Sequence, residues 1–280
     1  MLKDRVMFMS GGSRGIGLAI AARAARDGVK VALMAKTAEP HPKLPGTIYT
    51  AAEEIEAAGG EALPIVGDIR DADAVEAAVA QTVERFGGID LVVNNASAIN
   101  LAPMRDLEVK RFDLMQQINA RGTYVVTRAC LPHLRESDHA HVLTLSPPLS
   151  ADPRWLKGHS AYTLSKMGMT MITLGVAADE AEAGVAANCL WPRTIIATAA
   201  VQNLLGGDEA MARSRVPDIV ADAAYEILSR DPRSCTGKVF IDDEVLAEAG
   251  IADLDQYSGT PDAELALDIF VDGWPEPARS

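Results

Sequence analysis

The stretch that decides the fold is Val6-Met7-Phe8-Met9-Ser10-Gly11-Gly12-Ser13-Arg14-Gly15-Ile16-Gly17. Its apolar start predicts a buried strand, its glycines predict a tight turn, and the pattern that follows predicts a helix over Ile16-Arg26. Glycine lets a backbone turn sharply and approach a pyrophosphate closely, and a helix N-terminus offers free N–H groups to phosphate oxygens. A turn without a ligand is the alternative, but strand, turn and helix in this order favour a dinucleotide-binding turn formed by Gly11, Ser13, Arg14, Gly15, Ile16 and Gly17.

Short apolar runs alternate with longer helical patterns from this turn to about residue 240. The runs that we interpret as buried strands are Val6-Met9, Val29-Met34, Ala62-Val66, Leu91-Asn94, His141-Leu145, Ala186-Trp191 and Val239-Ile241. The helical patterns include Ile16-Arg26, Ala72-Phe86, Arg111-Leu134 and Ala161-Glu180. Continuous apolar strands separated by helices predict an α/β fold, a doubly wound, Rossmann-like parallel sheet of about seven strands flanked by helices.

No linker divides the chain, so we expect one domain over residues 1–280. Cofactor binding is expected mainly in 1–100, and the catalytic and substrate part in 101–243. A C-terminal extension, 244–280, is acidic and only weakly periodic. Such a tail either covers a sheet edge or reaches a neighbouring subunit.

Composition excludes several kinds of site. The formal net charge is −13, from 26 basic and 39 acidic side chains, which argues against a nucleic-acid surface and against docking on anionic membranes. Cys130, Cys189 and Cys235 lie far apart, without metal-ligand spacing, so we expect buried or unreactive thiols and no metal site. No apolar run is long enough to span a bilayer, so we expect no stable membrane insertion and a cytoplasmic protein.

Further motifs follow the glycine turn in a fixed order. Gly11, Gly15 and Gly17 have the spacing Gly-x-x-x-Gly-x-Gly, and the later motifs are Asp68-Ile69, Asn94-Asn95-Ala96, Asn119-x-x-Gly122 and Tyr162-x-x-x-Lys166. This set resembles the short-chain dehydrogenase/reductase family. The resemblance implies NAD(P)(H)-dependent alcohol and carbonyl chemistry and a homodimer or homotetramer.

One branch of that family is resembled in particular. The loop from Lys36 to Thr50, with Ser146-Pro147-Pro148 and Leu190-Trp191-Pro192, is similar to the hydroxysteroid dehydrogenase-like 2 branch. Animal members of the branch carry an added sterol-carrier domain. We expect no such domain within these 280 residues.

The end of the second strand bears on the choice of cofactor. NAD enzymes usually place a carboxylate there for the ribose hydroxyls, but this strand ends in Ala35 and is followed by Lys36. Lys36 and Arg14 together suit a 2′-phosphate and favour NADP over NAD, unless both are merely solvated surface cations. The resemblance further implies that Asp68 and Ile69 contact the adenine, and that Asn95 and Ala96 lie near the adenosine ribose. Asp68 could equally cap the helix that starts at Asp71.

Tyr162 and Lys166 are four residues apart in a predicted helix and so share one face. A neighbouring ammonium group favours the phenolate, and so does a positive nicotinamide ring, so we expect the two together to bring the pKa of Tyr162 down toward neutrality. The resemblance implies that Tyr162 is the catalytic acid/base, that Lys166 also binds the nicotinamide ribose, and that both therefore contact the cofactor. It also implies that Asn119 distorts its helix and helps to hold a proton-relaying water.

Two positions depart from the family pattern. The usual catalytic serine, thirteen residues before the tyrosine, is replaced by Leu149, so Ser146 is the better candidate, Ser150 the second, and the absence of any such serine stays open. The usual Pro-Gly turn is Pro192-Arg193. The backbone near Thr194 and Ile196 is still expected to bind the carboxamide, and Thr198 is expected near the pyrophosphate. Arg193 either forms a surface salt bridge or meets an anionic substrate group.

These features predict an NADP(H)-dependent oxidoreductase acting on a lipophilic alcohol or carbonyl compound of fatty acyl, terpenoid or steroid-like type. The segment Ile195 to Met211, which we expect to form a lid, is rich in apolar residues, although such residues more often belong to a core. The alternative is a catalytically weak or inactive NADP(H)-binding protein that acts as a sensor or assembly partner.

Near the C-terminus, Asp242-Asp243 replaces the family's Asp-Gly-Gly, which puts the family's usual subunit contact in doubt.

Overall fold

A computed structural model describes residues 2–41, 44–260 and 263–274. Its centre is a seven-stranded sheet in which every strand pairing is parallel, in the order β3-β2-β1-β4-β5-β6-β7. The strands are β1 (Val6–Ser10), β2 (Lys30–Ala35), β3 (Glu61–Val66), β4 (Leu91–Asn94), β5 (His141–Leu145), β6 (Ala186–Trp191) and β7 (Val239–Ile241). This architecture confirms the predicted doubly wound sheet, and the seven strands match the seven apolar runs to within one residue at each end.

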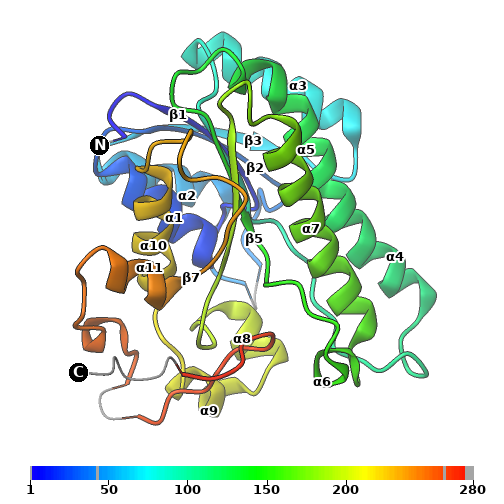
Figure 1. The fold of residues 1–280 in the computed structure, drawn as a ribbon. Coiled ribbons are helices and arrows are strands. Elements are labelled where there is room, and N and C mark those ends of the chain that lie inside the picture. The colour runs from blue at the N-terminus through cyan, green and yellow to red at the C-terminus, as the bar shows by residue number, and fades with distance from the viewer. Residues whose placement is uncertain (1, 42–43, 261–262, 275–280) are drawn as a thin grey trace.

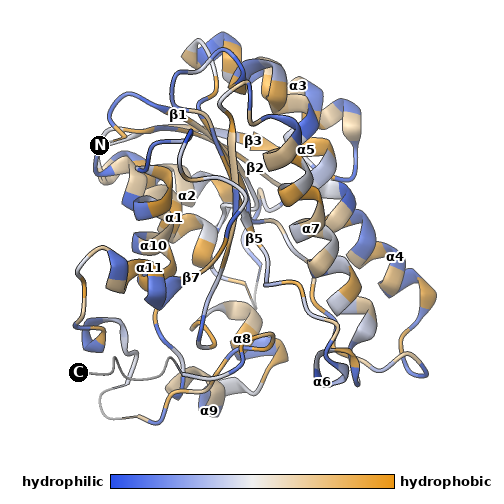
Figure 2. Cartoon of the chain, viewed as in Figure 1, coloured by the Kyte–Doolittle hydropathy of each residue, from blue (hydrophilic) through white to orange (hydrophobic). Residues whose placement is uncertain are grey.

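Helices cover both faces of the sheet (Figure 1). Apolar side chains of α1, α2, α10 and α11 pack in one core cluster and those of α3, α5 and α7 in another, and Figure 2 shows the apolar residues gathered on the strands and on the inner sides of these helices. The helices are α1 (Gly15–Ala25), α2 (Ile48–Ala57), α3 (Ala72–Phe86), α4 (Val109–Ile118), α5 (Ala120–Leu134), α6 (Pro153–Leu156), α7 (Ser160–Asp179), α8 (Ala199–Leu204), α9 (Gly207–Ala212), α10 (Asp218–Leu228) and α11 (Asp242–Glu248), with one 3-10 turn, η1 (Asp255–Tyr257).

Two sequence-based expectations of helix extent are wrong. The helix expected over Arg111-Leu134 is two helices, because Asn119 has φ −74° and ψ −80° and interrupts the α-helical backbone between α4 and α5. The loop expected up to Thr50 ends at Thr47. There, the Thr47 hydroxyl accepts from the Thr50 N–H, the Thr50 hydroxyl accepts from the Thr47 N–H, and this capping box starts α2.

The C-terminal segment lies within its own chain, across the residues that follow β6. Leu267 forms an antiparallel bridge with Thr194, and the Asp268 N–H donates to the Arg193 carbonyl over 2.9 Å. Figure 1 shows this segment passing α8 and α9 at the carboxyl end of the sheet. Residues 267 and 268 of the tail thus pair with the backbone that follows the strand β6, not with a sheet edge, and the expected contact with a neighbouring subunit stays a prediction.

The cysteines agree with their sequence-based reading. Cys130, Cys189 and Cys235 are buried and unpaired, and burial raises the pKa of the Cys130 and Cys189 thiols. In the described part of the chain, no helix combines the length and the apolar character needed to cross a bilayer.

Candidate active site

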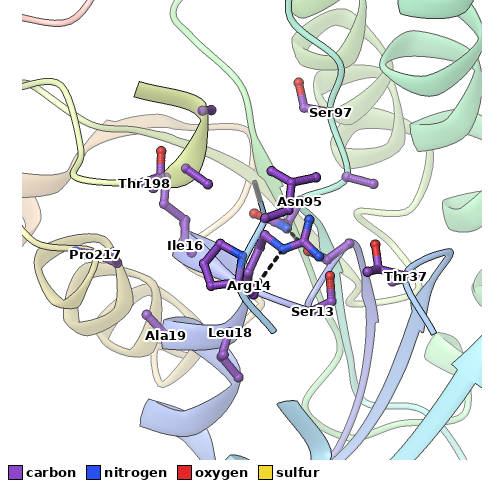
Figure 3. Close-up of a pocket in the computed structure, with 18 of the residues that line it drawn as sticks. Ser13, Arg14, Ile16, Leu18, Ala19, Thr37, Asn95, Ser97, Thr198 and Pro217 are labelled. Atoms are coloured by element: carbon purple, nitrogen blue, oxygen red, sulfur yellow. Dashed lines mark hydrogen bonds between the residues drawn. The ribbon is translucent and has the colours of Figure 1, made fainter. Parts of the chain in front are cut away.

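A cavity of about 1150 Å³ opens at the carboxyl ends of β1, β2, β3 and β4 and extends beneath α8 and α9 (Figure 3). Most of the residues expected to hold a dinucleotide line it: Gly11, Ser13, Arg14, Gly15, Ile16, Lys36, Asp68, Ile69, Asn95, Ala96 and Thr198. Others expected at the cofactor lie outside its lining: Gly17, Tyr162, Lys166, Pro192, Thr194 and Ile196. Further polar residues of the lining were not predicted, among them Thr37 and Ser97.

The glycine turn is fixed by close contacts with the residues after β4. Gly11 has φ +76°, and a Cβ atom there would lie 2.7 Å from the Ala96 Cα. The Asn95 side-chain amide donates to the Gly11 carbonyl over 2.7 Å. A Cβ on Gly17 would lie 2.4 Å from that same amide nitrogen. Gly17 is therefore required for packing behind the turn, although it does not itself face the cavity.

The first turn of α1 meets the cavity with its N–H groups uncapped. Arg14 occupies the N-cap position in an extended conformation, and no side chain among the described residues caps this helix end. Uncapped N–H groups and the helix dipole favour an anion at this position. Thr198, across the cavity, starts α8 with its hydroxyl accepting from the Val201 N–H. The donor set and the close backbone approach therefore fit the phosphates of a dinucleotide.

The two cations expected at a 2′-phosphate both line the cavity, and both already have partners. Arg14 donates to the Pro45 and Gly46 carbonyls over 3.0 and 3.1 Å, which fastens the proline-bearing loop to the glycine turn (Figure 3). The Lys36 ammonium lies 3.5 Å from the Asp68 carboxylate. Both cations therefore have protein partners, although 57% of the Lys36 side chain is exposed, and their role at a 2′-phosphate stays a prediction.

Asp68 is held mainly by its neighbour Arg70. The Arg70 guanidinium donates to both Asp68 oxygens, one of them at 2.5 Å, and this hydrogen bonding lowers the pKa of Asp68 to about 2. Asp71, and not Asp68, caps α3, accepting from the Asp73 and Ala74 N–H groups. The alternative interpretation of Asp68 as the helix cap is therefore wrong.

Tyr162 and Lys166 are both buried on α7, with 5% and 3% of their surface exposed. The Lys166 ammonium donates to the Leu145 carbonyl at the end of β5 over 2.7 Å. The Tyr162 hydroxyl makes no hydrogen bond with any residue that the structure describes.

Burial is the main influence on the pKa values of this pair. Burial, with the Asp268 carboxylate adding to it, raises the pKa of Tyr162 above its ordinary value, and the lowering expected from Lys166 and a nicotinamide ring together stays a prediction. Burial lowers the pKa of Lys166 to about 7, against the opposing effect of Asp268. Desolvation is therefore the largest cause of the shift for both groups, and for Lys166 it outweighs the charge of Asp268.

Asn119 ties the loop after β4 to α7. Its side chain accepts from the Ala98 N–H over 2.7 Å and donates to the Ala98 carbonyl over 3.0 Å. It also donates to the Ser165 hydroxyl, which in turn donates to the Tyr162 carbonyl, each over 2.8 Å. Ala98 lines the cavity, so this network links the cavity wall to the turn of α7 that carries Tyr162 and Lys166.

The two candidate serines are both engaged elsewhere. Ser146 is fully buried, and its hydroxyl accepts from Thr170 over 2.9 Å. The Ser150 hydroxyl accepts from the Asp152 N–H over 3.2 Å and so stabilises the turn before α6. Within the described residues neither serine is hydrogen-bonded to Tyr162, and whether Ser146, Ser150 or neither serves the reaction stays a prediction.

The segment after β6 is more buried than the sequence indicates. Arg193 is 4% exposed, and its guanidinium lies 2.5 Å from both Asp243 and Glu244 at the start of α11. It is therefore neither a surface salt bridge nor a free anchor for a substrate anion. Thr194 is fully buried with its hydroxyl unpaired, and Ile196 bridges Arg215.

An aromatic cluster around Tyr162 is the part of the site that sequence reasoning missed. Phe270 contacts Tyr162, Trp155, His159 and Trp191 through its ring. These residues come from the C-terminal segment, α6, α7 and β6, so no spacing in the sequence signals that they meet. The lid expected over Ile195 to Met211 forms α8 and α9, and its Leu204 and Met211 line the dinucleotide cavity.

One known protein family matches the part of the chain that holds both the glycine turn and the helix with Tyr162 and Lys166. A family model described as short chain dehydrogenase matches residues 5–207. The chain belongs to the short-chain dehydrogenase family. This membership accounts for the order of its motifs along the sheet, and it makes the chain an oxidoreductase by family and fold.

Individual known proteins are similar to this chain over most of its length. It is 53% identical to hydroxysteroid dehydrogenase-like protein 2 of Xenopus tropicalis over 274 residues, 98% of this chain and 65% of that protein. The chain thus spans about two thirds of that relative's length. A short chain dehydrogenase of Mycobacterium thermoresistibile is 60% identical, with TM-score 0.92, and covers 97% of this chain and 96% of its own. A metagenomic short-chain oxidoreductase solved with NADP is 25% identical, with TM-score 0.70, over 86% of this chain and 97% of its own.

Proposed function

We propose that this chain is an NADP(H)-dependent oxidoreductase that interconverts an alcohol and a carbonyl on a lipophilic substrate. The observation that carries the proposal is the hydroxyl of the buried Tyr162 side chain, which has no hydrogen-bond partner among the described residues, with the buried Lys166 one helical turn away. A hydroxyl that no protein group engages is available to a ligand oxygen. A substrate oxygen is the ligand that this family's chemistry supplies.

The cavity residues support binding of the dinucleotide. The first N–H groups of α1 would hold the pyrophosphate, and Arg14 and Lys36 would hold the 2′-phosphate, with Asp68 and Ile69 at the adenine. The NADP-bound relative supports the choice of cofactor. When bound, the dinucleotide supplies the hydride acceptor or donor.

The proton chemistry falls to the residues of α7. In the oxidising direction Tyr162 accepts the proton of the substrate hydroxyl, and in reduction it returns that proton to the carbonyl oxygen. The Lys166 ammonium stabilises the phenolate, and Asn119 orders the loop and the helix turn between which a relaying water would bind. Ser146 is the proposed donor to the substrate oxygen, with Ser150 second, and the hydrogen bond that Ser146 accepts from Thr170 does not use the Ser146 O–H.

The substrate class follows from the apolar surroundings. Leu204 and Met211 border the cavity, and an aromatic cluster encloses Tyr162. Such walls suit fatty acyl, terpenoid or steroid-like carbon skeletons better than polar ones.

A homodimer or homotetramer is also part of the proposal. Three large apolar side chains on α5 and α7 are more than half exposed: Tyr124, Leu164 and Met171. Exposed apolar side chains on two helices that pack against each other support a protein–protein contact.

A second candidate function is a cofactor-binding sensor or assembly partner with weak or absent catalysis. The observation that favours it is the raised pKa of Tyr162, because a phenol of this kind is a poor base at neutral pH. Cofactor binding fits both functions, so only turnover separates them.

The decisive experiment measures NADPH oxidation with medium and long aliphatic aldehydes and ketones, 3-ketoacyl-CoA thioesters and ketosteroids, for wild type and Tyr162→Phe. We expect turnover that the substitution lowers by about 10²–10⁴-fold, the range of general acid–base catalysis. The midpoint of unfolding should not change, because the hydroxyl makes no protein hydrogen bond in the described residues, and the NADPH dissociation constant should change far less than the turnover. Tight NADPH binding with no turnover by wild type on the whole panel would establish the sensor.

A further inference from the structure

Phe270 is the centre of the aromatic cluster around Tyr162. Its ring stacks on the Tyr162 ring at 6.3 Å between centroids and 23° between planes. Trp155 and Trp191 each approach it at 5.9 Å, at angles of 61° and 59°. Phe270 is only 4% exposed, so the C-terminal segment places a full aromatic ring directly against the proposed catalytic phenol.

The backbone of this segment is anchored on both sides of the ring. The Trp191 indole N–H donates to the Ile269 carbonyl over 2.8 Å. Beyond the ring, the Arg193 guanidinium donates to the Gly273 carbonyl over 2.5 Å, and Asp272 pairs with Arg154 of α6. Phe270 is thus held from β6, from the turn after β6 and from α6 together.

The conformation of Phe270 is a second, independent observation. Its φ is +71°, a left-handed value that a bulky side chain rarely adopts and that glycine adopts freely. Such strain persists only where surrounding contacts over-determine it, and it is concentrated at functional sites. This backbone conformation directs the Phe270 ring into the aromatic cluster, and an ordinary extended backbone would direct the ring elsewhere.

The dinucleotide cavity ends before this cluster. Its lining on that side is Ser97, Ala98 and Ile99, and it includes neither Tyr162 nor Phe270. A substrate whose carbonyl oxygen reaches the Tyr162 hydroxyl would therefore lie beyond this lining and beside the aromatic cluster, in which the Phe270 ring stacks on the Tyr162 ring.

We propose that Phe270 is a specificity-determining residue, whose ring limits the substrate to carbonyl compounds with a slender or flat apolar group beside the reacting carbon. Aromatic faces pack well on unbranched or planar groups, and a branched carbon beside the carbonyl collides with the Phe270 ring. This inference rests on the proposed function and names its substrate class.

The test compares 2-decanone with 3-methyl-2-decanone, which differ by one branch beside the carbonyl. The variant is Phe270→Gly, because glycine accepts the left-handed backbone and removes only the ring. The matched control is Leu267→Ala, since Leu267 lies on the same segment, is 37% exposed and is outside the cluster. Two quantities are measured for each protein: kcat/KM with NADPH, and binding of each ketone to the NADP⁺-saturated protein by tryptophan fluorescence.

We expect Phe270→Gly to raise the branched-to-linear ratio by about tenfold, the scale of one methyl group in a fitted pocket. The control should leave that ratio and the NADPH dissociation constant unchanged. A ratio that stays constant in both rate and binding, in a variant that still unfolds cooperatively, overturns the inference.

The binding measurement separates this inference from the proposed function. If the binding ratio shifts while no ketone is turned over, the role of Phe270 in specificity is supported and the catalytic proposal is overturned. If wild type reduces 2-decanone and Phe270→Gly keeps the same preference, the catalytic proposal is supported and the role of Phe270 is overturned. Absence of both binding and turnover in every protein overturns both.

Discussion

The side-chain amide of Asn95 donates a 2.7 Å hydrogen bond to the carbonyl oxygen of Gly11, which joins the residues after β4 to the turn after β1. These two loops lie at the point where the strand order reverses between β1 and β4. In doubly wound sheets, ligands bind at such a point. The shape of the cavity therefore depends on a side chain that is not itself part of the glycine motif.

Gly17→Ala should weaken cofactor binding through this hydrogen bond. The added methyl group would lie 2.4 Å from the Asn95 amide nitrogen and would force it away from Gly11. Loss of one such bond costs about 1 kcal/mol, so we expect the NADPH dissociation constant to rise by at least about fivefold. Fluorescence titration with NADPH measures this rise.

Gly175→Ala is the matched control for that substitution. Gly175 lies inside α7, and a Cβ atom there would have no neighbour within 4 Å. We expect unchanged NADPH affinity and a gain in the free energy of unfolding of about 0.5–1 kcal/mol, because alanine favours a helix interior. An equal loss of affinity in both variants would contradict the role assigned to Asn95.

Lys36→Ser should lower the preference for NADPH over NADH. Lys36 lines the cavity and pairs with Asp68 at 3.5 Å, so its removal takes away one cation without opening the core. A charge-assisted hydrogen bond to phosphate contributes about 1.5–3 kcal/mol, so we expect NADPH affinity to fall by about ten- to a hundredfold. NADH affinity, measured by the same titration, should change little. Equal loss for both cofactors would show that Lys36 does not meet the 2′-phosphate.

Arg193→Met should destabilise the fold. It removes the partner of the Asp243 carboxylate, which is 6% exposed, and leaves that charge buried. Breaking one side of a buried pair costs about 3–5 kcal/mol, which urea unfolding can measure. The exposed pair Arg85–Glu61, at 3.1 Å, is the control. Arg85→Met should change the free energy of unfolding by less than about 1 kcal/mol.

His141 should make the protein sensitive to mild acid. Burial lowers the pKa of this fully buried ring to about 4, so the unfolded chain binds its proton first as the pH falls. The stabilisation is therefore complete above about pH 6.5, and it is lost progressively as the pH falls from there toward 4. At pH 5 the loss is about 2 kcal/mol.

The measurement compares wild type with His141→Gln, because other groups titrate in the same range. The raised pKa values of Asp242 and Asp268, both about 7 through burial, act in the opposite direction and cancel in the difference. We expect the wild-type advantage in urea unfolding to shrink between pH 7 and pH 5. A constant difference would show that His141 does not titrate in this window.

The sequence by itself determined the sheet and the glycine turn. Strands buried on both faces appear as continuous apolar runs, and the turn after β1 requires glycine because Gly11 adopts φ +76° against Ala96. Both signals are local in the chain, since each depends on the neighbours within a few residues. The break at Asn119 was implied only by the family resemblance, because its cause is a pair of bonds to Ala98, which is 21 residues away.

Only the tertiary structure decided the surroundings of the reacting residues. The buried pairing of Arg193 with Asp243 and the ring of Phe270 against Tyr162 join segments 50 and more than 100 residues apart. Burial, which raises the pKa of Tyr162, is likewise a property of everything packed around the group. Desolvation and long-range packing leave no periodic trace in a sequence, so the chemistry of the site emerges only when the chain is folded.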